Sequence, residues 1–125
     1  MVESLFPPPA YAHAAVTSGG LVFTAGAVPL DADGALVGAG DHAAQARQVL
    51  ENLRTQLAAA GAAPADVVKT TVYVVGAGED LVAAWDVVRA SDFAGAPSTL
   101  LGVALLGYRG QLVEIEATAV LEAER

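Results

Sequence analysis

The sequence predicts an α+β domain in which one mixed β-sheet carries two helices on one of its faces. The first observation is the order of the patterns, because strand-like and helix-like segments mix without a strict β-α-β alternation. The second is a strand pattern at residues 112–121 that is apolar on one face and carries two glutamates on the other. The third is a length of 125 residues with no internal repeat or linker, which suits a single domain over 1–125.

The chain begins with a proline-rich lead-in, residues 1–10, which we expect to be extended because consecutive prolines exclude helix. Residues 11–17 and 21–25 are expected to form a hairpin around a turn signal at 18–20. Gly26 follows the second strand directly, and a glycine at a strand end allows a ligand or a neighbouring segment to approach the backbone closely.

A clear helix pattern begins at Asp41, which is a suitable N-cap, and Gly61 and Pro64 fit its end. The apolar stripe that we expect to be buried repeats at three and four residues and consists of Ala46, Val49, Leu50, Leu53, Leu57 and Ala60. The side expected to face solvent consists of Gln45, Gln48, Glu51, Arg54 and Thr55. The preceding residues 31–40 are predicted to be a loop with at most one short strand.

Residues 67–75 are rich in β-branched side chains and apolar on both faces, which predicts a strand inside the sheet. A second helix is expected to begin at Glu79 and Asp80, where the helix dipole favours acidic residues. Residues 98–106 are predicted to be a further strand, followed by a turn at 107–110. The buried stripe of the second helix would consist of Leu81, Ala84, Trp85 and Val88.

The strand at 112–121 organises the predicted sheet. On one face Glu114 and Glu116 stand roughly 6–7 Å apart, which is two residues of strand rise. Two interpretations remain open on composition alone: a solvated sheet face, or a carboxylate placed in a pocket where its surroundings tune it for proton transfer. The opposite face, which we expect to pack on the helices, consists of Val113, Ile115, Ala117, Ala119 and Leu121.

Composition and charge exclude several classes of function. The net charge of −8, with six Lys and Arg spread singly, argues against a nucleic-acid partner. The absence of cysteine excludes disulfides and thiolate nucleophiles, and neither His13 nor His42 has a partner at ligand spacing, so we expect no metal site.

The same numbers predict where and in what form the protein works. No apolar run reaches the roughly 20 residues of a membrane span and no secretory signal is recognised, so we expect a cytoplasmic protein with no membrane partner. A hydrophobic content of 54% with only 16% charged residues predicts an oligomer whose subunits cover each other's apolar surface.

Five further side chains are candidates for chemistry. Tyr11 could present a hydroxyl and Arg109 could hold an anion, while the alternatives are a partly buried structural tyrosine and a solvated turn residue. His13 could act as a base or be structural. Ser98 and Thr99 have no sequence-local base and no nucleophile-elbow pattern, which argues against a hydrolase triad. The chain contains no phosphate-binding loop motif and no dinucleotide-binding glycine pattern.

Six motifs, in chain order from about Tyr11 to the end, carry a resemblance to a known family. Together they resemble the Rid (reactive intermediate deaminase, YjgF-like) superfamily. The resemblance implies a chorismate-mutase-like α+β fold and a homotrimer that forms a barrel, with sheets inward, helices outward and a small-molecule pocket at each subunit interface. The motifs are Tyr11-Ala-His-Ala, Leu21-Val-Phe-Thr-Ala-Gly26, Gln45-Ala-Arg-Gln-Val-Leu-Glu-Asn52, Ala59-Ala-Gly61, Asp66-Val-Val-Lys69-Thr-Thr-Val-Tyr73 and Leu112-Val-Glu114-Ile-Glu116-Ala117.

For members with deaminase activity, the resemblance implies cofactor-free hydrolysis of 2-imino and 2-enamino acids to 2-keto acids and ammonia. It assigns the water-orienting glutamate to Glu114 and substrate-binding positions to Tyr11 and the backbone of Gly26. The arginine that clamps the substrate carboxylate lies in a Pro-Ala-Arg-Ser motif, whereas this chain has Thr99 at that position. A threonine offers one neutral hydroxyl in place of a charged, bidentate fork.

We therefore expect a homotrimer that binds a small metabolite between subunits and hydrolyses an imine, an enamine or a related C–N bond, with Glu114 orienting water. Because Thr99 replaces the clamp, the substrate is expected to be neutral, cationic or anchored by Arg109, and 2-imino acids are expected to be poor substrates. The alternative is a non-catalytic small-ligand binding or regulatory trimer. A ribonuclease, an activity sometimes attached to this family, fits poorly with a net charge of −8.

Overall fold

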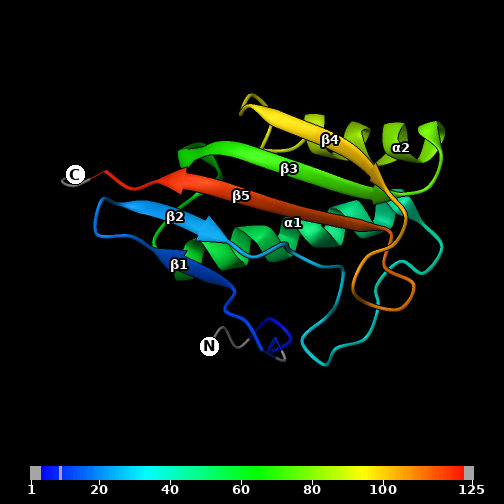
Figure 1. Ribbon diagram of the computed structural model, residues 1–125, viewed down its shortest axis with the longest axis horizontal. Coiled ribbons are helices and arrows are strands. Elements are labelled where there is room, and N and C mark those ends of the chain that lie inside the picture. The colour runs from blue at the N-terminus through cyan, green and yellow to red at the C-terminus, as the bar shows by residue number, and fades with distance from the viewer. Residues whose placement is uncertain (1–3, 9, 123–125) are drawn as a thin grey trace.

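In the computed structural model, which describes residues 4–8 and 10–122, a five-stranded mixed sheet is covered by two helices on one face (Figure 1). The strand order is β1-β2-β5-β3-β4, with β3 and β4 parallel and the other neighbours antiparallel. The predicted α+β class, with one mixed sheet and two helices on one face, is confirmed. The elements are β1 (Ala14–Val16), β2 (Leu21–Thr24), α1 (His42–Ala59), a short 3-10 helix (Pro64–Asp66), β3 (Val67–Val75), α2 (Gly78–Arg89), β4 (Ser98–Val103) and β5 (Val113–Val120).

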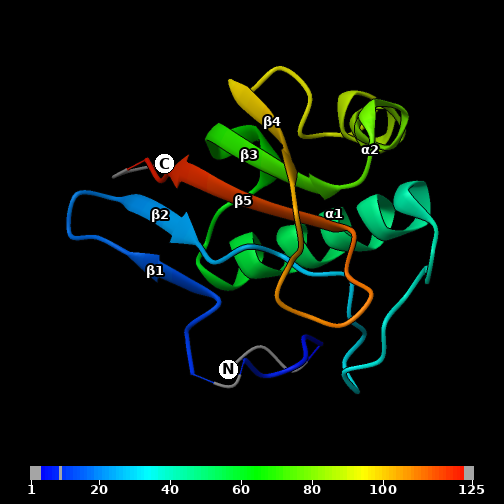
Figure 2. The same cartoon turned by 45° about the vertical axis from the view of Figure 1, so that its right-hand side comes forward.

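Both helices lie on the same side of the sheet. α1 packs against β5 and β2, while α2 packs against β3, β4 and α1 (Figure 2). The limits of α1 follow the predicted signals, since the Asp41 carboxylate accepts a hydrogen bond from the Ala44 N–H at 3.0 Å and Gly61 has a positive φ of 85°. In the part of the chain that the structure describes, no helix has the length and apolar content needed to cross a membrane.

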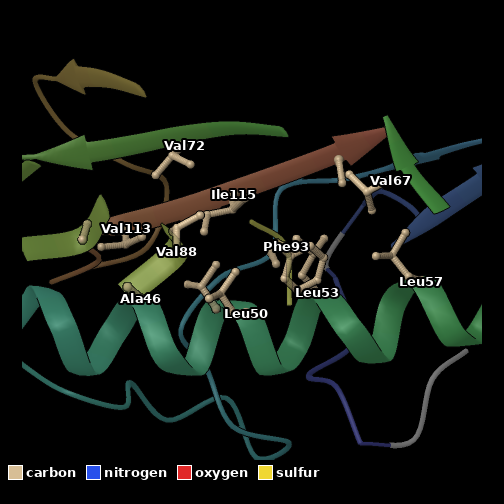
Figure 3. Close-up of a cluster of buried hydrophobic side chains, with 14 of the residues drawn as sticks. Ala46, Leu50, Leu53, Leu57, Val67, Val72, Val88, Phe93, Val113 and Ile115 are labelled. Atoms are coloured by element: carbon tan, nitrogen blue, oxygen red, sulfur yellow. The ribbon is translucent and has the colours of Figure 1, made fainter. Parts of the chain in front are cut away.

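The hydrophobic core fills the space between the helices and the sheet (Figure 3). Leu50, Leu53 and Leu57 of α1 point toward the sheet and are at most 2% exposed. Ile115 of β5 and Phe93, which follows α2, belong to the same cluster. The predicted apolar face of the last strand is confirmed, because its buried residues are Val113, Ile115, Ala117 and Ala119, with Leu121 half-buried beyond the strand end.

Two strands are shorter than their sequence patterns predict. β1 covers 14–16 rather than 11–17, because only these three residues pair in register with β2. β4 ends at Val103 rather than at residue 106, because its partner β3 ends at Val75, directly opposite Val103. In both cases the limit is set by the neighbouring strand, which a pattern along one segment does not contain.

The loop at 31–40 and the lead-in add little regular structure. The short strand considered within the loop is reduced to a single bridge between Leu30 and Leu36. Of the extended lead-in predicted for 1–10, residues 1–3 and 9 lie outside the described residues. Leu5 is 5% exposed, so the lead-in is anchored on the body of the domain.

Three amide side chains of α1 are buried, and the prediction that Gln45 faces solvent is wrong. The Oε1 atom of Gln45 accepts a hydrogen bond from the Leu112 N–H at 2.7 Å, and its Nε2 atom donates to two loop carbonyls. Asn52 and Gln56 likewise donate to backbone carbonyls of the segments that precede β1 and follow β2. Buried backbone groups of irregular segments need hydrogen-bond partners, and α1 supplies amides where no strand is present.

The face of the sheet opposite the helices is not covered by the described residues of the chain. Glu114 and Glu116 of β5 lie on this open face, opposite Tyr73 and Thr71 of β3. The one-sided helix cover predicted from the sequence is confirmed, and it leaves apolar side chains in contact with solvent. The exposed apolar residues on the open face include Leu21, Phe23, Leu101 and Val120.

Candidate functional site

The fold brings the predicted site residues Glu114 and Gly26 together. Glu114 lies near the start of β5, with its half-buried side chain on the open face. The chain that follows β2 runs beside it, because the backbones of Ala27 and Ile115 exchange hydrogen bonds of 2.7 and 3.3 Å. A Cβ atom at Gly26 would overlap the carboxyl group of Glu114, so only glycine leaves room for the carboxylate in this place.

A buried amide holds the same carboxylate from its other side. Gln111 is 3% exposed, and its Nε2 atom donates to Glu114 Oε1 at 2.9 Å and to the Val113 carbonyl at 3.1 Å. The Oε1 atom of Gln111 accepts a hydrogen bond from the Tyr108 N–H at 3.1 Å. One side chain therefore connects the Glu114 carboxylate to the turn that carries Tyr108.

Tyr11 reaches this turn from the lead-in. Its hydroxyl lies 3.1 Å from the hydroxyl of Tyr108. Burial raises the pKa of the Tyr11 phenol far above its ordinary value, and the hydrogen bond with Tyr108 and the negative charge of Glu114 raise it further. Tyr11 therefore stays protonated through the neutral range, which makes it a hydrogen-bonding group and not a base.

Glu116 stands two residues further along the open face and has different neighbours. Tyr73 lies between the two glutamates, and its phenol pKa is raised first by burial and then by the charge and hydrogen bonding of Glu116. The charge of a glutamate thus acts on two of the three tyrosines of the chain, Tyr11 and Tyr73. Of the two interpretations left open by the sequence, the contacts with Gly26 and Gln111 favour a placed carboxylate for Glu114.

Two hollows adjoin Tyr11, and only one of them belongs to this cluster. A cavity of about 20 Å³ lies against Tyr11, Tyr108 and Gly26, and this volume suits about one water molecule. A wider groove of about 420 Å³ lies on the other side of Tyr11, along β1 and the end of α1. Neither Glu114 nor Gly26 lines that groove, so we place the candidate site on the open face, where the chemistry-bearing groups meet.

Thr99 does not join Glu114 within one subunit. It is exposed on β4 and pairs with Thr71 of β3, which in turn pairs with Glu116 of β5. Two strand spacings therefore separate Thr99 from β5, or roughly 10 Å. The Thr99 hydroxyl accepts a hydrogen bond at 2.6 Å from Nζ of Lys69, the only lysine in the sequence. A positive charge therefore lies beside Thr99, the position that matches the arginine of the Pro-Ala-Arg-Ser motif.

The remaining candidates stay outside the cluster. Arg109 is exposed beside Tyr108 and forms no hydrogen bond or ion pair with any residue of 4–8 or 10–122. The Nε2 atom of His13 donates to the Phe6 carbonyl at 3.2 Å, which is the structural alternative for this residue. The hydroxyl of Ser98 accepts a hydrogen bond from Thr70 at 2.7 Å. Among the described residues no group of three or more His, Cys, Asp or Glu could hold a metal ion.

Three residues of this region, Tyr108, Gln111 and Lys69, are not among the site residues predicted from the sequence. Tyr108 and Gln111 lie in an irregular turn, where no periodic pattern assigns a face to a side chain. Lys69 is different, because it lies four residues before Tyr73 in β3, and side chains at this spacing in a strand point to the same face. Strand periodicity therefore contains enough information to place Lys69 on the same face as the glutamates.

The assembled groups can accept a proton and bind a small polar ligand. Glu114 offers a carboxylate oxygen that Gln111 does not occupy, and the neighbouring phenols of Tyr11 and Tyr108 can donate or accept hydrogen bonds. A carboxylate within hydrogen-bond reach of a bound water is the arrangement that general-base catalysis requires.

The comparisons with known proteins agree on one family. The family model described as Endoribonuclease L-PSP matches residues 3–121 of the chain. A 2-iminobutanoate/2-iminopropanoate deaminase of Salmonella typhimurium is 48% identical over 59 residues, which is 47% of this chain and 45% of that protein. Two E. coli crystal structures cover 98% of this chain and 96% of their own: the YjgF gene product, with a TM-score of 0.80 at 29% identity, and TdcF with bound serine, with a TM-score of 0.81 at 28% identity.

Proposed function

Because this chain belongs to the endoribonuclease L-PSP family, which is the YjgF/Rid family, we propose that it binds a small imine or enamine beside Glu114 and hydrolyses its C–N bond. The observation that carries the proposal is the placement of the Glu114 carboxylate. It is seated over Gly26 and held by Gln111 at 2.9 Å, and its charge acts on the Tyr11 phenol, whose hydroxyl lies 3.1 Å from that of Tyr108. The chain therefore has the general base and hydrogen-bonding groups that such a hydrolysis uses.

In the proposed reaction, Glu114 takes a proton from a water molecule as the water oxygen attacks the imine carbon. The same proton is then given to the nitrogen, which completes a carbinolamine. Glu114 next takes the proton of the carbinolamine hydroxyl and transfers it to the nitrogen as the C–N bond breaks, so the products are a carbonyl compound and ammonia. An enamine is first protonated at carbon and enters the same sequence as its imine. Glu114 begins and ends the cycle ionised, and no oxidation state changes, so the chemistry needs no redox cofactor.

The names of the similar proteins support a small ligand. The Salmonella protein is named for two 2-imino acids, and the E. coli TdcF crystal contains serine, so both names point to compounds of amino-acid size. The match to the deaminase covers less than half of that protein. Its substrates are therefore a starting point for the assay and not an assignment.

We propose that the substrate is neutral, cationic or anchored by a cation other than the family arginine, because Thr99 stands at that position. The wild-type protein should release ammonia from 2-aminoacrylate slowly in a coupled assay, and Thr99→Arg should increase the rate. A charged, bidentate partner for a carboxylate is worth about ten- to a hundredfold in binding over none.

Two cations could take over the role of the missing arginine, so the assay includes Arg109→Ala and Lys69→Met. Loss of 2-imino acid turnover in either variant would identify that residue as the anchor. Rapid turnover that survives both substitutions would contradict the inference drawn from Thr99. Neutral and cationic imines, which do not use the anchor, serve as internal controls in the same variants.

We further propose that the protein is a homotrimer with the ligand site at each subunit interface. The open face exposes apolar side chains, of which Phe23 is 46% exposed, and a covering subunit would bury them. Light scattering should give about three times the 12.5 kDa chain mass. A monomer at micromolar concentration would refute this arrangement.

A non-catalytic ligand-binding or regulatory trimer is the second candidate, and the loss of the arginine favours it. It would show ligand-induced stabilisation without turnover of any imine in the panel. RNA cleavage, which the family description names, is disfavoured by a net charge of −8 and a single lysine, because phosphate binding depends on clustered cations.

A further inference from the structure

We propose that Gln111 is a positioning residue that holds the Glu114 carboxylate and the Tyr108 phenol in a fixed relation, and that it selects Oε2 of Glu114 as the oxygen that accepts the proton. The proposal rests on the proposed function for its chemistry. The geometric argument concerns Gln111 and Tyr108, which are not among the site residues predicted from the sequence.

The hydrogen bonds of Gln111 leave its amide no freedom to rotate. Its Nε2 atom donates to Val113 and Glu114, and its Oε1 atom accepts from Tyr108, so a flip of the amide would break all three hydrogen bonds. The side chain is 3% exposed, so water could not replace the lost partners without opening the turn. The Gln111 amide thus has one orientation, and its hydrogen bonds hold both Glu114 and Tyr108 in place.

For Glu114 the consequence is that its two carboxylate oxygens differ. Oε1 receives the Gln111 hydrogen bond at 2.9 Å. Oε2 is the atom seated closest to Gly26, and within the described part of the chain it receives no hydrogen bond. An oxygen without a donor partner is the better proton acceptor, so a water that Glu114 deprotonates should bind Oε2.

For Tyr108 the consequence is that its ring stays in reach of Tyr11. Gln111 holds the Tyr108 backbone N–H, and the Tyr108 hydroxyl lies 3.1 Å from that of Tyr11. The titratable and charged groups around Glu114 are Tyr11 from the segment before β1, Tyr73 from β3 and Glu116 from β5, and the turn at 107–110 adds Tyr108 and the exposed Arg109. Among these groups only Tyr108 shares a hydrogen-bond partner with Glu114.

The test replaces the amide by its closest isostere, in Gln111→Glu. Two carboxyl groups in contact share one proton and titrate in two steps. While the shared proton is present, the introduced carboxyl can donate to Glu114 Oε1 as the amide does. Once that proton is lost, the two charges repel and Glu114 leaves its place. Imine turnover should therefore match wild type within about threefold at low pH and fall at least tenfold through an additional pH-dependent step that wild type lacks.

Gln45→Glu is the matched control. Gln45 is also a buried amide, and it holds the same turn through the Gly110 carbonyl and the Leu112 N–H, but it does not touch Glu114. Its substitution should change the melting temperature without adding a step to the pH profile of turnover. The same additional step in both variants, or in neither, would overturn the positioning role of Gln111.

A second measurement does not need turnover. Burial, the hydrogen bond with Tyr108 and the charge of Glu114 raise the pKa of the Tyr11 phenol. Gln111→Met releases the Tyr108 turn and the Glu114 carboxylate, so it should shift the alkaline absorbance titration of Tyr11 downward. A Tyr11→Phe variant identifies which of the three tyrosines is observed. A downward shift in a protein that hydrolyses no imine would support the positioning role while the proposed function fails. An unchanged titration in a folded Gln111→Met variant would overturn the positioning role whatever the activity.

Discussion

Glu114→Gln should reduce imine turnover by about 10²–10⁴-fold, the usual contribution of a general base, and leave assembly unchanged. Glutamine has the shape of glutamate, and its side-chain oxygen can still accept the hydrogen bond from Gln111 that now measures 2.9 Å. The substituted side chain also fits over Gly26 as the carboxylate does. The substitution therefore removes the basic oxygen and little else. The measurement is the rate of ammonia release, together with light scattering to confirm the oligomeric state.

Glu116→Gln is the control on the same strand and the same face. Glu116 is not in contact with Gln111 or Gly26 in the described residues, and its influence reaches Tyr73 instead. We expect this variant to lose much less activity than Glu114→Gln. Equal losses in the two variants would mean that the general charge of the open face, and not the placement of Glu114, supports the reaction. Unchanged kinetics in Glu114→Gln would assign Glu114 a structural role.

Leu53→Ala should lower the free energy of unfolding by about 2–5 kcal/mol. Leu53 is 0% exposed and lies in the middle of the cluster that joins α1 to β5 and Phe93 (Figure 3). Its truncation removes buried apolar area and leaves a cavity that close-packed neighbours fill only partly. Because a domain of this size has a free energy of unfolding of about 5–15 kcal/mol, this loss is a large fraction of the total.

The measurement for Leu53→Ala is urea unfolding at one fixed protein concentration, since subunit association would add to the apparent stability. Val82→Ala is the matched control. Val82 lies on α2, is 58% exposed and is outside the core cluster, so its truncation should change the free energy of unfolding by about 0.5 kcal/mol or less. Similar losses for both variants would contradict the position of the core.

The residues that sequence reasoning placed correctly are those whose role is expressed locally. Asp41 and Gly61 mark the ends of α1 because a helix terminus needs a cap and a left-handed residue within one turn. The limits of β3 at Val67–Val75 are as predicted, because the β-branched run itself defines the strand. The alternation along β5 identified the buried face and left Glu114 on the other, since side chains of a strand point alternately to its two sides.

The errors concern residues whose surroundings come from distant parts of the chain. Gln45 looks like a solvent-facing helix residue, yet it is buried because the Leu112 N–H, 67 residues away, needs an acceptor there. β4 ends early because β3 offers it no further partner.

For the candidate site, the sequence by itself determined that Glu114 stands on the uncovered face and that Gly26 follows β2, because strand alternation and the absence of a side chain are local properties. Only the tertiary structure decided that the two meet, that Gln111 fixes one oxygen of the carboxylate and that Tyr11 meets Tyr108 across 97 residues. The hydrogen bonds of Gln111 satisfy buried polar groups of an irregular turn, and such groups take whichever partner the folded chain brings within about 3 Å.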